Sequence, residues 1–321
     1  REISFPDRTV FILLIGFKSL ICIINLFFPD GQYLRQSSLH AAAGGVILGI
    51  ATSLNYVFRG SVTGMSGMLY STVTLENVHY FFISDEMPKN IAIIGGMLLI
   101  SGIFFDIFEY GLLTSLLPSV LNQTSPSTLP AGIRSGGILV GIGTKLSNGC
   151  TSGHGLCGLA RFSLRSIVAV LSFLISGIAI STIILHAGGL GHSHKTDIPT
   201  NQLDHTITAN ICIAIGVILP LAGLILRIRA SNQALPVGNN STQSNSYSFF
   251  YKDQLILFLV GLIFGLGLLV SGMVRRSNII NFLALGKDWN PSLMFVLGCG
   301  LAVNLIFFTY MIKVRKEPIL G

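Results

Sequence analysis

The chain has 321 residues, of which 51% are hydrophobic and only 10% are charged. Soluble domains carry roughly 25% charged residues, so the composition excludes an ordinary soluble protein and indicates a membrane protein. In a soluble protein the net charge of +7 would suggest nucleic-acid binding, but in a membrane protein basic residues in the cytoplasmic loops explain it. We therefore expect a lipid bilayer around the chain and no nucleic-acid partner.

Long apolar segments recur along the whole sequence. A bilayer core of about 30 Å needs about 20 apolar residues in helical form. Eight segments approach this length, so the sequence predicts an all-α polytopic membrane protein with eight transmembrane helices. The predicted spans are 9–28, 39–58, 90–113, 133–149, 165–187, 206–228, 253–271 and 291–312.

Lysine and arginine are unevenly divided between the two sides of this arrangement. Cytoplasmic loops of membrane proteins are enriched in basic residues. With both termini in the cytoplasm, twelve basic residues lie inside and six outside, so we predict this orientation. The sequence does not indicate which membrane the protein occupies. The six outside residues are Arg35, Arg134, Lys195, Arg275, Arg276 and Lys287.

A polar segment of low complexity divides the chain. Residues 230–248 contain few apolar side chains, a composition that favours a flexible linker. We therefore predict an N-terminal membrane part over residues 1–229 and a C-terminal membrane part over residues 249–321, joined by this linker.

One pattern occurs three times: two glycines four residues apart, followed by a break rich in Gly, Ser and Thr. Non-helical backbone at membrane depth occurs only where protein buries it or where it lines a wet cavity. Transporters built from repeats place their binding sites at such breaks, although glycine pairs also serve close helix packing alone. We predict re-entrant half-helices from internal, inverted repeats. The glycine pairs are Gly45 with Gly49, Gly137 with Gly141, and Gly261 with Gly265.

The second break, SNGCTSGHGLCGLARFSLRS over residues 147–166, carries the most chemistry. Its glycines let the backbone approach a ligand, and its hydroxyls and thiols are neutral donors. Such donors suit an anion that must bind and leave, whereas full charges in low dielectric would repel or trap it. We predict Cys150 as the constriction of a pore. The alternative is that Cys150 is a small buried apolar residue.

The predicted pore and substrate-binding residues come from all three breaks. Lys145 lies about one turn before Cys150 and either attracts the anion or pairs with Asp106 or Glu109. The second break contributes Lys145, Gly149, Cys150, Thr151, Ser152, Gly153, His154 and Cys157, the first contributes Thr63 and Ser66, and the third contributes Ser271 and Met273.

Histidine and cysteine are also metal ligands. Cys150, His154 and Cys157 form a C-x3-H-x2-C run, but a fourth ligand is missing, so we predict no metal and no cofactor. Two alternatives to transport of an anion stay open. One is a membrane thiol enzyme with Cys150 as nucleophile. The other is a metal-ion carrier that uses the predicted external histidines, which are His186, His192, His194 and His205.

The runs GIGTKLSNGCTSGHGLCGLARFSLRS and GGVILGIATSLNYVFRGSVTGMSG resemble the sulfur-transport (YeeE/YedE) membrane family, which includes thiosulfate uptake proteins. The C-terminal run GLIFGLGLLVSGMVRRSNIINFLALGKDWNPSLMFVLG resembles the small subunit of the family's two-subunit form, so the chain looks like a fusion of both subunits. The resemblance implies a transporter, not an enzyme, for thiosulfate or a related small sulfur-containing anion. We also expect a cytoplasmic sulfurtransferase-type partner. Of the family's successive pore cysteines only Cys150 carries over, because the third break has Ser271-Gly272-Met273 in place of a thiol.

Overall fold

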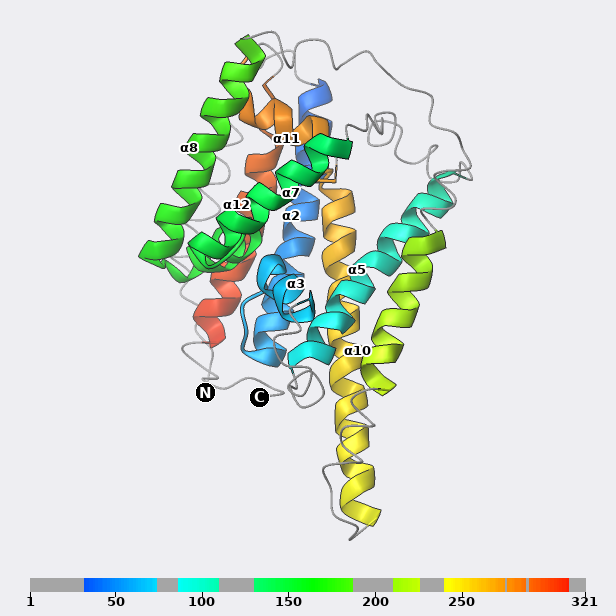
Figure 1. Cartoon of the computed structure of the whole chain (residues 1–321). Coiled ribbons are helices and arrows are strands. Elements are labelled where there is room, and N and C mark those ends of the chain that lie inside the picture. The colour runs from blue at the N-terminus through cyan, green and yellow to red at the C-terminus, as the bar shows by residue number, and fades with distance from the viewer. Residues whose placement is uncertain are drawn as a thin grey trace.

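The structure is a computed structural model that describes residues 32–73, 86–109, 130–186, 210–225, 240–274, 276–286 and 289–311. Every regular element within these ranges is a helix, as Figure 1 shows. The all-α class predicted from the sequence is therefore confirmed.

Five helices of the described part are long and apolar enough to cross a membrane. Their apolar stretches coincide with five of the eight predicted spans, and this marks the chain as an integral membrane protein. The five helices are α2 (Gln32–Arg59), α5 (Glu86–Glu109), α8 (Leu164–His186), α10 (Asn240–Val270) and α12 (Ser292–Tyr310).

The three other predicted spans are not among these five helices. Span 9–28 lies outside the described residues. Span 133–149 corresponds to α7 (Pro130–Ser147), which is less apolar because it contains two basic residues and five glycines. Span 206–228 corresponds to a helix, Asn210–Ile225, that is shorter than a bilayer crossing. The predicted number of eight spans is thus not established.

Helix α2 lies at the centre of the bundle and contacts both α12 and α10, while α5 packs against α10. Gly44, near the middle of α2, touches Ser271 just beyond the end of α10. About one turn further along α2, Leu48 lies against Gly267 of α10. The residue numbers rise on one helix and fall on the other, so α2 and α10 are antiparallel.

The glycines of the first repeat copy bring α2 into backbone contact with α12. Gly45 touches Val296, and a Cβ added to Gly49 would lie 2.7 Å from the Cβ of Val303. These numbers rise together, so α2 and α12 are parallel. Small residues let helices approach closely in a membrane, where lipid supplies no hydrophobic drive for association. In this copy the glycine pair therefore serves helix packing.

The third copy packs in the same manner against α5. Gly261 touches the carbonyl oxygen of Ile93, and Gly265 touches the side chain of Ile100. A larger residue at either position would push α10 away from α5. The glycine pairs of the first and third copies thus build one continuous four-helix core of α12, α2, α10 and α5.

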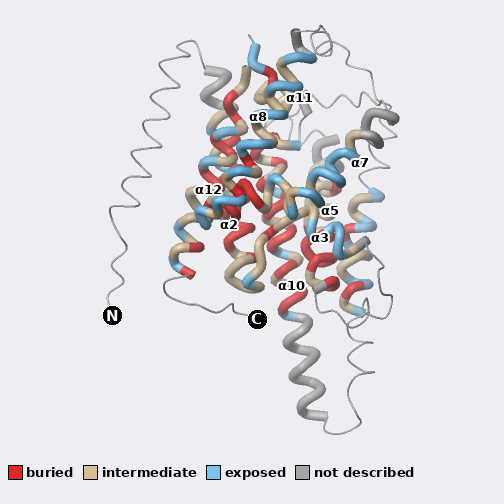
Figure 2. The backbone as a smooth tube through the Cα atoms, turned by 60° about the vertical axis from the view of Figure 1, so that its left-hand side comes forward, coloured by how far each residue is buried: buried red, intermediate tan, exposed pale blue. Residues whose placement is uncertain are grey.

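The second copy differs from the other two. Nothing within the described residues lies within 4 Å of a Cβ added to Gly137 or Gly141 of α7. Half of the apolar stretch of α2 is buried, but only 6% of that of α8 is buried. Figure 2 shows this contrast as buried residues along α2 and mainly exposed residues along α7. Helices α7 and α8 therefore lie at the outside of the core, while the segment between them is buried against it.

Each repeat copy ends at a residue with positive φ: Gly60 at 70°, Asn148 at 57° and Gly272 at 68°. Glycine and asparagine tolerate this left-handed conformation, which explains their presence here. The break follows the second glycine of the pair by seven residues in the second and third copies but by eleven in the first. Helix α2 therefore runs about one turn further before it breaks. A short helix follows each break: α3 (Met65–Val73), η1 (Ser152–Gly158) and α11 (Arg276–Leu283).

The predicted linker lies partly within a helix. Residues 240–248 form the first turns of α10, and residues 230–239 lie outside the described part of the chain. The C-terminal part of the chain thus contributes α10, α11 and α12, two of which belong to the four-helix core.

Candidate functional site

The first and second breaks lie against each other. A Cβ added to Gly153 would lie 3.6 Å from the Cα of Gly64. The main-chain amide and the hydroxyl of Ser66 lie within hydrogen-bonding reach of the Cys150 sulfur. Two segments that are far apart in the sequence therefore form one site.

Cys150 is half-buried and is surrounded by neutral donors. Its sulfur lies 3.0 Å from the Ser152 hydroxyl oxygen, and the amide of Gly153 is also within reach. Together with the amide and hydroxyl of Ser66, these groups give four donors around one thiol. Neutral donors of this kind can hold an anion without the strong attraction of a full positive charge.

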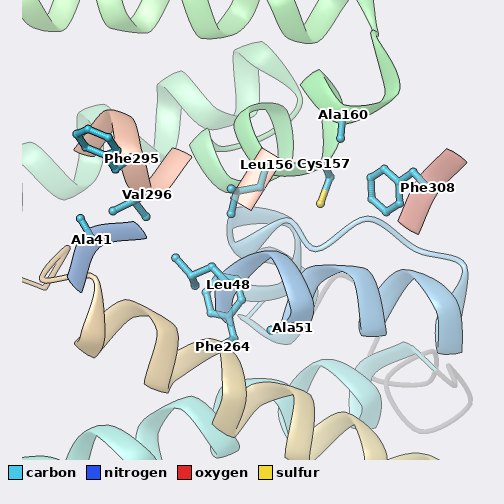
Figure 3. Packing of buried hydrophobic residues seen from close by; sticks show 10 residues of the cluster. All are labelled: Ala41, Leu48, Ala51, Leu156, Cys157, Ala160, Phe264, Phe295, Val296 and Phe308. Atoms are coloured by element: carbon cyan, nitrogen blue, oxygen red, sulfur yellow. The ribbon is translucent and has the colours of Figure 1, made fainter. Parts of the chain in front are cut away.

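The second cysteine of the segment has different surroundings. Cys157 is fully buried, and its sulfur lies near the main-chain amide of Thr63. Figure 3 shows the thiol among apolar side chains of the core, with Leu156, Ala160 and Phe308 in the same cluster. Cys157 therefore packs as part of the core, while Cys150 is partly exposed.

The segment that carries Cys157 is a π-helix, η1, which begins two residues after Cys150 and is followed by the short 3-10 helix η2 (Leu159–Arg161). Single π-helical turns occur frequently at functional sites. A Cβ on Gly158 would collide with the Ser166 hydroxyl, so only glycine lets the turn approach α8 here. The segment ends at Phe162, whose φ of 51° redirects the chain into α8.

His154 is a predicted pore residue that the structure places behind the cysteine turn. Its Nδ1 lies 3.0 Å from the Ser166 hydroxyl, and its Nε2 lies 3.3 Å from the carbonyl oxygen of Ser147. Arg165 donates to the same carbonyl at 3.2 Å. A Cβ on Gly149 would lie 2.6 Å from His154 Nε2, so Gly149 makes room for the ring. Both ring nitrogens of this buried histidine thus hold the two ends of the turn together.

Lys145 lies beside an aromatic ring. Its ammonium nitrogen is 3.7 Å from the centre of the Tyr70 ring on α3, a distance that gives a cation–π interaction. This contact ties the end of α7 to α3. The side chains of the expected carboxylate partners, Asp106 and Glu109, lie outside the described residues. Thr151, another predicted site residue, is exposed and makes no capping hydrogen bond through its side chain.

The third break lies against the middle of α2. Ser271 touches Gly44, which is about 20 Å along the helix axis from the break that ends α2. The amide of Asn278 on α11 donates to the carbonyl oxygen of Gly272 at 2.9 Å and fixes this turn. Ser271 donates to the Leu268 carbonyl oxygen at 2.9 Å, and the Met273 amide donates to the Ser271 hydroxyl at 3.4 Å, so these two predicted residues bond within their own break.

The first break is held by a buried asparagine of α2. The amide nitrogen of Asn55 donates to the Thr63 hydroxyl oxygen at 2.9 Å and to the Ser61 carbonyl oxygen at 3.2 Å. Thr63, a predicted pore residue, is only 1% exposed. Its hydroxyl therefore belongs to the support of the break, while its main-chain amide faces Cys157.

A second polar group holds α3. Arg59 donates to the Asn90 side-chain oxygen at 2.6 Å, and the Asn90 amide donates to the Ser71 hydroxyl at 2.6 Å. These bonds join the end of α2 to α5 and α3. Arg59 and Lys89 lie between the predicted spans 39–58 and 90–113, on the side that the predicted orientation puts in the cytoplasm, and they are thus at the same end of the bundle as the first break.

The sequence interpretation missed a buried polar group on α2 and α12. The side-chain oxygen of Asn304 accepts hydrogen bonds from Thr52 at 2.8 Å and Ser53 at 2.7 Å. Its amide nitrogen donates to the carbonyl oxygen of Leu156 in η1 at 2.9 Å. The available signal was the presence of polar residues inside otherwise apolar spans, because such residues are costly in a membrane and need partners.

Within the described residues, no group of three His, Cys, Asp or Glu side chains is placed to hold a metal ion. The predicted external histidines His192, His194 and His205, and the side chain of His186, lie outside the described part. The described geometry therefore gives the metal-carrier alternative no support.

Two families of known sequences match the chain. The sequence model of the sulphur transport family matches residues 30–180, and that of a family of unknown function matches residues 253–321. A probable transporter of Xylella fastidiosa strain 9a5c is 38% identical over 140 residues, which cover 89% of that protein and 43% of this chain. Its counterpart in strain Temecula1 gives the same identity and coverage. The chain belongs to the sulphur transport family.

Further similarity is shorter. Another probable transporter of strain 9a5c is 45% identical over 49 residues, which are 34% of that protein. No solved structure matches the chain significantly. The sulphur transport match contains the Cys150 segment, whereas Asn304 and the third break lie in the C-terminal match.

Proposed function

We propose that this membrane transporter carries thiosulfate or a related small sulfur-containing anion past a constriction at Cys150. The observation that carries the proposal is the group of four neutral donors around the Cys150 sulfur, contributed by two helix breaks. Membership of the sulphur transport family supports the sulfur-containing cargo.

The chemistry of the donors suits conduction. Amide and hydroxyl groups donate to anionic oxygens, and the thiol adds a polarisable sulfur beside the terminal sulfur of thiosulfate. In the proposed site the anion lies between Cys150, Ser66, Ser152 and Gly153. Each contact is weak enough to be exchanged, so the anion can leave as well as bind.

The third break provides a second level in this proposal. Ser271 packs against Gly44 in the middle of α2, and α10 runs antiparallel to α2. An inverted pair of re-entrant segments would put one break near each mouth of the pathway. We assign the short helices α3, η1 and α11 to these re-entrant segments.

The test is uptake of radiolabelled thiosulfate into proteoliposomes. Replacement Cys150→Ala is expected to lower the uptake rate at least about tenfold, equal to about 1.4 kcal/mol in the barrier. The control is Cys212→Ala, a half-buried cysteine on the helix Asn210–Ile225, outside the site. Unchanged uptake by correctly folded Cys150→Ala protein contradicts the constriction role, and absence of uptake by the wild type contradicts the thiosulfate cargo.

The same preparation separates transport from enzymatic sulfur chemistry. A thiol enzyme would form a persulfide on Cys150 and turn over in detergent, where no gradient exists. The proposal expects intact thiosulfate inside the vesicles and no mass increment on Cys150. Sulfite, sulfide and sulfate in parallel assays define which anions share the pathway.

The proposal also includes the orientation of the chain in the membrane and a partner protein. Both termini are assigned to the cytoplasm, which puts Arg59, Lys89 and the first break on that side. A cytoplasmic sulfurtransferase-type protein would then meet the cargo as it leaves. Labelling of single cysteines introduced near residues 2 and 320, in sealed cells and after permeabilisation, checks the orientation.

A further inference from the structure

Asn304 is a polar side chain in the middle of an apolar helix and is fully buried. Its neighbours one turn away on the same face of α12 are Gly300 and Phe308. A Cβ on Gly300 would lie 2.7 Å from the Leu156 side chain, so α12 touches η1 at this level. Asn304 therefore lies where α12 meets both the central helix and the cysteine segment.

The hydrogen bonds of Asn304 join three parts of the chain. Its oxygen accepts from the hydroxyls of Thr52 and Ser53 on α2, and its nitrogen donates to the Leu156 carbonyl of η1. Leu156 directly precedes Cys157 and lies within the same π-helical turn that begins beside Cys150. A carboxamide is suited to this place because it both accepts and donates.

We propose that Asn304 is a positioning residue that holds the cysteine turn against α2, and that the C-terminal part of the chain thereby sets the geometry of the Cys150 site. This inference rests on the proposed function for its transport readout. Asn304 does not touch the proposed anion, since it contacts the turn from the side of the core. It acts through the Leu156 carbonyl.

The alternative is that Asn304 only stabilises the core. Gln254 on α10 provides a matched control, because it is also a buried carboxamide that donates to a carbonyl of another helix. Its nitrogen bonds the Pro220 oxygen at 2.8 Å, on the helix Asn210–Ile225 and away from the cysteine turn. Gln254→Leu removes its one bond to a carbonyl, whereas Asn304→Leu removes the bond to the Leu156 carbonyl and the two bonds accepted from Thr52 and Ser53. Only Asn304→Leu releases η1.

The experiment measures modification of each cysteine by a small maleimide in the purified full chain, normalised to labelling after denaturation. In the wild type Cys157 is expected to react very slowly because it is fully buried. In Asn304→Leu we expect labelling of Cys157 to rise about tenfold or more, since the unpaired Leu156 carbonyl favours opening of the turn. Gln254→Leu is expected to leave Cys157 protected. Thiosulfate uptake should fall about tenfold in Asn304→Leu and by less than about threefold in Gln254→Leu.

Equal protection of Cys157 in Asn304→Leu and wild type overturns the proposal, as does equal exposure of Cys157 in both leucine variants. If Asn304→Leu does not fold, Asn304→Ser gives the same comparison, because serine leaves room for water but is too short to reach Leu156. The labelling needs no substrate. It therefore decides the role of Asn304 even if the wild type does not transport thiosulfate, a result that would contradict the proposed function alone.

Discussion

The four-helix core and the α7–η1–α8 unit use the same sequence device in different ways. In the core, glycine pairs bring α2 against α12 and α10 against α5, and a Cβ on these glycines would meet backbone. In α7, the corresponding Gly137 and Gly141 have no described neighbour within 4 Å. The tight helix packing lies in the four-helix core, and the partly exposed thiol of Cys150 lies in the α7–η1–α8 unit.

This difference indicates that the core provides rigidity and that the α7–η1–α8 unit provides the cysteine site. Tight backbone contact in the core fixes α2 as a rigid reference, because packed interiors tolerate little change in volume. The cysteine turn is held against this reference by a few hydrogen bonds from His154, Asn304 and Arg165. Substitutions in the core should therefore change folding, whereas substitutions around the turn should change activity.

The largest effect is expected from a glycine of the core. Gly261→Val places a side chain against the Ile93 carbonyl and should destabilise the protein by about 3 kcal/mol through overpacking. Thermal unfolding in detergent, followed by size-exclusion chromatography, measures this loss. The matched change Gly141→Val in α7 should be close to neutral. An equal loss of stability in both variants would show that α7 has a packing partner, and it would contradict the difference in packing between the two regions.

A smaller effect is expected at His154. In His154→Leu the Ser147 carbonyl and the Ser166 hydroxyl lose a partner, which costs about 1–3 kcal/mol locally. The turn should become sensitive to proteolysis between residues 147 and 163, and transport should fall, while the melting temperature of the core changes little. His40→Leu on α2 is the control. A large fall of the melting temperature in His154→Leu would mean that the outer unit and the core unfold together.

The third break gives a still smaller change. Asn278→Ala removes one hydrogen bond to the Gly272 carbonyl and should cost about 1 kcal/mol. Because the donors around Cys150 come from the first and second breaks and not from the third, the maleimide reactivity of Cys150 should stay at the wild-type value. Altered reactivity would show that the third break is coupled to the Cys150 site.

The smallest effect concerns Lys145. Lys145→Met removes the cation–π contact with Tyr70, worth about 0.5–1 kcal/mol at an exposed site. Stability should hardly change, and thiosulfate uptake should fall only if the charge also attracts the anion. Lys145→Arg retains both charge and ring contact and serves as the control. A fall in uptake for methionine with recovery for arginine assigns Lys145 to the pathway.

Bilayer thickness made part of the fold predictable. Spans such as those of α2, α10 and α12 follow from the length of apolar segments, since a helix must bury about 20 residues to cross. The positions of the breaks also follow from local chemistry, because Gly60, Asn148 and Gly272 adopt positive φ. These features depend on residues close together in the sequence.

Contacts between distant segments were not predictable in this way. The pattern treats the three breaks as equivalent, but the first break follows an extra turn of α2, and the antiparallel packing of α10 puts Ser271 against Gly44 in the middle of α2. A histidine between two cysteines suggests ligand chemistry, yet His154 bonds Ser147 and Ser166 behind the turn. A single asparagine inside the apolar span of α12 indicates that it needs a partner, but only the structure shows that Thr52, Ser53 and Leu156 are its partners.

The contact of α12 with the cysteine turn has a consequence for assembly. The regions matched by two separate sequence families, residues 30–180 and 253–321, occupy one chain here. Covalent connection converts their association into an intramolecular step, with an effective concentration on the order of millimolar for short connections. Their ratio is fixed at one to one, and their pairing does not depend on expression level or on dilution in the membrane. The bond between Asn304 and Leu156 therefore forms within one chain, and the packing of α12 and α10 against α2 and α5 supports it.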